Sequence, residues 1–152
     1  MLIATLLLHA ALLVQGDDTL LTARKHLEAG ETGAALTLLR DLLAKGTDPQ
    51  RDVRLLLAEA ELANGDPQAA IEALVPLTEA DDYEGLLATG RAFKAWGDAQ
   101  ARSQRHISDA GASYEEARAY LDRAAAHAPK GDSLAAVEAG YIDLYQMGDH
   151  EA

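Results

Sequence analysis

The residue types that most often carry out catalysis are few in this chain, and their spacing does not fit the common catalytic patterns. There are five histidines and no cysteine, so the chain has no thiolate nucleophile and no sulfur ligand for zinc. No two histidines stand three or four residues apart, which excludes the helical zinc pattern HExxH. No serine lies in a GxSxG segment, and neither GxGxxG nor GxxxxGK[ST] occurs. We therefore predict a non-enzyme without catalytic, cofactor-binding or metal sites.

One group of basic side chains stands out from an otherwise acidic sequence. Lys and Arg number 13 and Asp and Glu 25, for a net charge of −12, which argues against a nucleic-acid partner. Arg91, Lys94, Asp98, Arg102 and Arg105 follow spacings of 3, 4, 4 and 3 residues. On one continuous helix they would form a stripe of net charge +3. This stripe is either a docking surface for an acidic peptide or protein face, or an ordinary solvated helix face.

The amino-acid composition predicts the secondary structure that positions these side chains. The chain has 152 residues, enough for one domain with a real core. It contains 32 Ala and 25 Leu but only one Phe and one Trp, which favours helix over sheet. We predict an all-α protein.

A glycine followed by an acidic residue recurs along the chain and divides it into repeats. The four glycines are Gly30, Gly65, Gly97 and Gly148, and the interval from Gly30 to Gly65 is 35 residues. A glycine can close a helix in the left-handed conformation, and an acidic residue suits the start of the next helix. Each repeat is therefore predicted to be a helix, a turn and a second helix.

This pattern resembles the tetratricopeptide repeat, a helix–turn–helix unit of about 34 residues. Besides the turn glycines, three groups of residues match. They are the small residues seven before the first three glycines (Ala23, Ala58 and Gly90), the close-packing alanines of the second helices (Ala35, Ala70 and Ala117) and two unit-ending prolines (Pro49 and Pro129). The family's bulky aromatic in the first helix is missing from two units, where His26 and Glu61 stand; Phe93 fits. The resemblance implies a right-handed α–α superhelix that binds proteins.

The repeats and the segment before them give the predicted organisation. It comprises a signal peptide at 1–16, repeats at 17–48, 49–81 and 82–130, and the first helix of an incomplete repeat at 131–152. The third repeat carries about 15 inserted residues, because Gly97 and Ala117 are 20 apart where the first two units need 5. We predict a first helix extended past Gly97, a break at 109–111, and a second helix from Ser113 to Ala128. Ser113 and Glu116 form a capping-box signature.

The last helix is expected to be unpaired. It spans 133–147 and has apolar Leu134, Val137, Tyr141 and Leu144 at helical spacing. A solenoid helix without its partner leaves an apolar face open. We therefore expect the chain to be the N-terminal piece of a longer protein, with self-association through this helix as another possibility.

The first 14 residues, MLIATLLLHAALLV, are almost wholly apolar. They are too few to span a bilayer, which takes about 20 residues, and they fit the apolar region of a secretory signal. Cleavage after Gly16 would make the protein periplasmic or secreted; the alternative is an uncut cytoplasmic chain whose first helix packs on the repeats. The signal-like start and the Ala-, Leu-, Arg- and Asp-rich composition point to a bacterium.

Within the resemblance, the first helix of each repeat lines a concave groove where a partner lies. Taking each turn glycine as the register, the groove positions are Leu20, Arg24, Leu27 and Glu28; Asp52, Leu55, Glu59 and Leu62; Glu84, Leu87, Arg91 and Lys94; and Glu138, Ile142 and Tyr145. Leu20, Leu27, Leu55 and Leu62 could instead pack between helices. The partner-binding candidates are Arg24, Glu28, Asp52, Glu59, Arg91, Lys94, Arg102, Arg105 and Tyr145.

The function expected from this pattern is a non-catalytic scaffold that binds a protein or peptide. Two alternatives stay open: an accessory or regulatory domain of a larger enzyme or sensor whose active part lies beyond residue 152, and a self-associating structural module.

Overall fold

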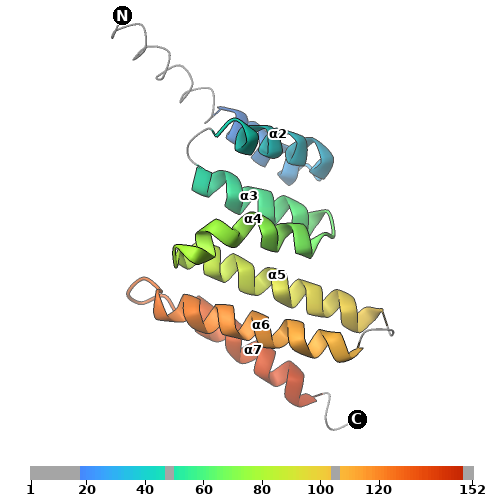
Figure 1. The fold of residues 1–152 in the computed structure, drawn as a ribbon, viewed down its shortest axis with the longest axis vertical. Coiled ribbons are helices and arrows are strands. Elements are labelled where there is room, and N and C mark those ends of the chain that lie inside the picture. The colour runs from blue at the N-terminus through green and yellow to red at the C-terminus, as the bar shows by residue number, and fades with distance from the viewer. Residues whose placement is uncertain (1–17, 47–49, 104–106, 149–152) are drawn as a thin grey trace, which may run out of the picture. The chain divides into compact units, whose positions relative to one another are not determined.

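The computed structural model describes residues 18–46, 50–103 and 107–148, and all regular elements in these ranges are helices (Figure 1). After a helix over 18–28, the chain forms α2 (Thr32–Ala44), α3 (Gln50–Ala63), α4 (Pro67–Glu79), α5 (Tyr83–Arg102), α6 (Ile107–Ala126) and α7 (Leu134–Gly148). The predicted all-α helical-repeat class is confirmed. The predicted signal segment, 1–16, lies outside the described residues. No helix in the described ranges is long and apolar enough to cross a membrane.

The helices form two compact units, Met1–Gly65 and Asp66–Ala152. In the first, α2 packs on α3; in the second, α4 packs on α5, α5 on α6, and α6 on α7. Packing between helices that follow each other in the chain is characteristic of helical repeats. The division falls at Gly65, inside the second predicted repeat, so the repeat boundaries remain predictions.

Two of the four predicted turn glycines act as their type predicts. Gly30 and Gly65 have φ of +76° and +80°, the left-handed conformation that ends a helix. The Asp66 side chain caps the next helix by accepting a hydrogen bond from the Ala69 N–H at 3.0 Å, and Pro67 is the first helical residue. The small residues of the repeat pattern lie in the core, with Ala23, Ala35, Ala58, Ala70 and Ala117 all buried.

The first unit contains a buried carboxylate. The Glu61 side chain is 4% exposed, and its Oε1 accepts a hydrogen bond from Arg40 Nη2 on α2 at 2.6 Å. Its other oxygen, Oε2, is buried without a hydrogen-bond partner. Glu61 stands where the repeat pattern has a bulky aromatic, so a charged side chain occupies a position that is usually apolar in such repeats. Arg40 from the neighbouring helix compensates it.

Removing Arg40 alone should therefore lower the stability of the fold more than replacing both Arg40 and Glu61. We expect Arg40→Ala to lower the free energy of unfolding by about 2 kcal/mol, because it leaves a buried carboxylate without its cation. The double variant Arg40→Ala, Glu61→Leu should recover most of this loss, since an apolar side chain of similar size needs no partner. Urea unfolding followed by circular dichroism measures both. A double variant as unstable as Arg40→Ala would contradict this account of the pair.

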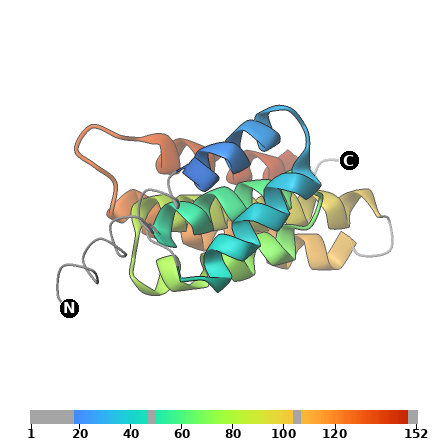
Figure 2. The same cartoon turned by 90° about the horizontal axis from the view of Figure 1, so that it is seen from above.

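In the second unit, α5 and α6 run side by side over most of their length (Figure 2). Two glycines allow this approach. A Cβ on Gly90 would lie 2.7 Å from Leu121 Cγ, and a Cβ on Gly97 would lie 2.7 Å from Cε1 of Tyr114. Gly97 is therefore not a turn residue. It lies inside α5, which continues to Arg102, so the predicted extension of this helix past Gly97 is confirmed.

The predicted start of α6 at Ser113 is wrong. The helix begins at Ile107 and continues through Gly111, so there is no break at 109–111. Ser113 does not cap a helix: it is buried, and its Oγ donates a hydrogen bond to Gln100 Oε1 of α5 at 2.8 Å. Packing against the extended end of α5 stabilises the first turns of α6, and this outweighs the low helix propensity of Gly111.

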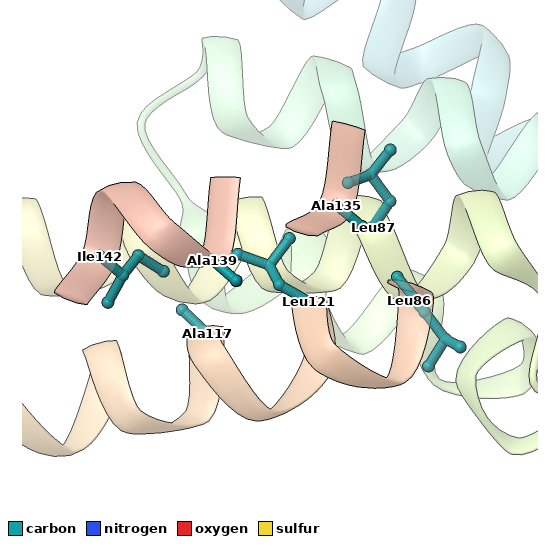
Figure 3. Packing of buried hydrophobic residues seen from close by; sticks show 8 residues of the cluster. Leu86, Leu87, Ala117, Leu121, Ala135, Ala139 and Ile142 are labelled. Carbon is teal, nitrogen blue, oxygen red and sulfur yellow. The ribbon is translucent and has the colours of Figure 1, made fainter. Parts of the chain in front are cut away.

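The core of the second unit lies between α5, α6 and α7 (Figure 3). Leu121 and Ala117 of α6 point toward Ala139 and Ile142 of α7 (Figure 3). Tyr83, Phe93, Tyr114 and Tyr120 pack against this core, and Phe93 stacks on Tyr120 with ring centroids 5.5 Å apart. This core fixes which face of α7 is buried and which is open.

Candidate partner-binding surface

Four of the predicted partner-binding residues lie in the first unit, and all are exposed. Arg24 and Glu28 are on the helix over 18–28, whereas Asp52 and Glu59 are on α3. Asp52 and Glu59 are seven residues apart and so share one face of α3. Asp52 Oδ1 lies 3.4 Å from Nη1 of its neighbour Arg51, a weak surface contact. These side chains are accessible to a partner.

In the second unit, the predicted groove residue Arg91 is bound in an ion pair. Its Nε lies 3.1 and 3.0 Å from the two carboxylate oxygens of Glu138 on α7, and its Nη2 lies 2.6 Å from Oε1. The hydrogen bonds that Arg91 donates to Glu138 raise the pKa of the Arg91 guanidinium. Two groove positions far apart in the sequence therefore meet, and each compensates the other's charge.

Lys94 is also compensated. Its Nζ donates to Asp98 Oδ2 at 2.9 Å, and Asp98 Oδ1 accepts a hydrogen bond from the Tyr114 hydroxyl at 2.8 Å. The helix is continuous, as the basic stripe requires, but the first two of its four cations have carboxylate partners. Arg102 is exposed in the last turn of α5. Arg105 and the side chain of Tyr145 lie outside the described residues, so their role stays a prediction.

Two predicted groove positions are wrong. Leu87 and Ile142 are buried in the core between α5, α6 and α7 rather than available to a partner. The reason is the orientation of α7, which packs on α6 through Ala135, Ala139 and Ile142. Counting residues from the turn glycine does not determine how α7 is rotated about its own axis relative to α6.

A polar contact at the start of α7 had no sequence signal. The Tyr83 hydroxyl donates to Asp132 Oδ2 at 2.8 Å, and Asp132 Oδ1 accepts from the Leu134 N–H at 2.9 Å. The backbone hydrogen bond from Leu134 and then that from Tyr83 lower the pKa of Asp132. Desolvation, together with the carboxylate of Asp132, raises the pKa of Tyr83. Tyr83 and Asp132 are 49 residues apart, too far for any spacing rule to connect.

A second such contact ties α6 to the end of α4. Arg123 Nη2 bonds to the Thr78 carbonyl oxygen at 3.0 Å and to Asp81 Oδ1 at 2.7 Å. This guanidinium lowers the pKa of the Asp81 carboxyl.

Within the described ranges, no group of three His, Asp or Glu side chains is placed to hold a metal ion.

The successive helices, the left-handed turn glycines and the buried small residues define a helical-repeat protein. The sequence pattern of the family described as Tetratricopeptide repeat matches residues 26–89. Residues 26–89 are therefore similar to the tetratricopeptide repeat family, whose members generally mediate protein–protein interactions and are typically non-catalytic. Searches of curated proteins and of solved structures gave no significant match.

Proposed function

We propose that this protein is a non-catalytic scaffold that binds a peptide or protein partner along the first helices of its repeats. The observation that carries the proposal is the tetratricopeptide repeat match over residues 26–89. The exposed charges of α3 lie in this region, as does Glu28. The first unit is the better place for a partner, because its candidates are exposed whereas Arg91 and Lys94 of the second unit already have carboxylate partners.

The proposal is tested by selecting ligands from a displayed library of random peptides on the intact chain. The affinity of the enriched peptides is then compared between the wild type and the variant Asp52→Lys, Glu59→Lys. We expect this variant to weaken binding at least about tenfold, equivalent to roughly 1.4 kcal/mol, because it reverses two charges on the proposed binding face.

A matched control is available on α4. Glu72 and Glu79 are also exposed, seven residues apart on one helix, but on a second helix of the repeat. Glu72→Lys, Glu79→Lys therefore makes the same change in net charge and should alter affinity less than about twofold. Equal losses in the two variants would show a non-specific charge effect, and no loss in either would remove α3 from the binding surface.

A further inference from the structure

The outward face of α7 is the largest group of exposed apolar side chains on one helix in the described residues. Leu134, Val137, Tyr141 and Leu144 are 43%, 49%, 60% and 65% exposed. Their spacings of 3, 4 and 3 residues place them in one line along the helix. We call these four residues the α7 seam. Large apolar residues aligned in this way are characteristic of a surface that another helix covers.

The charged side chains within α7 have partners of opposite charge. The only acidic or basic residues of α7 are Glu138 and Asp143. Glu138 is held by Arg91 of α5, and Asp143 accepts a hydrogen bond from Arg118 of α6. Hydrogen bonds to Asp122 and to Asp143 raise the pKa of Arg118. Both carboxylates of α7 therefore face arginines of the same unit, so the repulsion between two such helices is reduced.

The register of α7 argues against the usual second helix of a repeat as the partner. Seven residues before Gly30, Gly65 and Gly97 stand Ala23, Ala58 and Gly90. At Gly90, even a Cβ would be 2.7 Å from Leu121 of the second helix. The equivalent residue before Gly148 is Tyr141. A phenol ring at this position prevents the close approach made at Gly90 and suits a helix that packs farther away.

We propose that the α7 seam pairs with the same seam of a second copy of this chain, to form a two-fold symmetric dimer. A face with a 3–4–3 line of apolar residues is self-complementary, which a two-fold interface requires. The compensated charges of α7 favour a second copy in particular. The chain carries a net charge of −12, so two copies repel each other, and this repulsion is weakest at a face whose carboxylates are paired with arginines. This dimer is independent of the proposed peptide-binding face on α3.

Sedimentation equilibrium of the intact chain over a concentration range of about a hundredfold tests the proposal. We expect a species of twice the chain mass of 16.1 kDa at the upper end, and dissociation on dilution. The variant Tyr141→Glu, Leu144→Glu should stay monomeric throughout, with unchanged helicity by circular dichroism. Val75→Glu, which changes an apolar residue of α4 that is 43% exposed, should dimerise like the wild type.

Chemical cross-linking gives a second measurement that does not place charge in the seam. Because the chain has no cysteine, Tyr141→Cys introduces a single thiol. A short bismaleimide should link two copies of this variant and should not link Val75→Cys. A wild type that is monomeric over the whole range would overturn the proposal. So would a dimer that survives Tyr141→Glu, Leu144→Glu, or equal cross-linking at positions 141 and 75. The peptide-binding test on α3 can succeed or fail independently of these results.

Discussion

Leu121→Ala should lower the free energy of unfolding by about 3 kcal/mol. Leu121 is 1% exposed and lies in the core between α5, α6 and α7, where its side chain packs against Gly90 of α5. Removing most of its side chain leaves a cavity that three helices border. Because native domains have a net stability of roughly 5–15 kcal/mol, such a loss is large. Urea unfolding followed by circular dichroism, at one protein concentration, measures it.

Leu21→Ala is the control for this prediction. The chemical change is the same, but Leu21 is 51% exposed on the helix over 18–28. We expect a loss within about 0.5 kcal/mol. Similar losses in the two variants would mean that Leu121 is not packed between the helices as described.

The second large effect is expected at a glycine that the repeat pattern did not single out. A Cβ on Gly85 would lie 2.4 Å from the Cβ of Leu77, an atom attached directly to the backbone of α4. Gly85→Ala must therefore push α4 and α5 apart. We expect a loss of about 2 kcal/mol in the free energy of unfolding, despite the better helix propensity of Ala. Thermal and urea unfolding both report it.

Gly111→Ala is the matched variant and should have the opposite sign. Gly111 lies inside α6 with ordinary helical backbone, and nothing lies within 4 Å of an added Cβ. Ala should raise the free energy of unfolding by about 0.5–1 kcal/mol. A destabilised Gly111→Ala would instead support the break at 109–111 that the sequence pattern suggested.

The sequence alone determined the helical class, the turns at Gly30 and Gly65, and the small residues between the helices. These features depend on local backbone chemistry: Gly30 and Gly65 take a conformation that other residues rarely adopt, and Asp66 and Pro67 suit a helix start. The exposed candidates Arg24, Glu28, Asp52 and Glu59 followed from the same register, although their role in binding remains a prediction.

Tertiary structure decided what depends on contacts between distant residues. The start of α6 at Ile107 comes from packing against α5, which outweighs the local signal at Ser113. The charge of Arg91 is compensated by a residue 47 positions away. The rotation of α7 buries Ile142 and leaves the α7 seam open. Spacing places residues on a helix face, but only the packing of that helix on its neighbours decides which face meets the core and which can meet a partner.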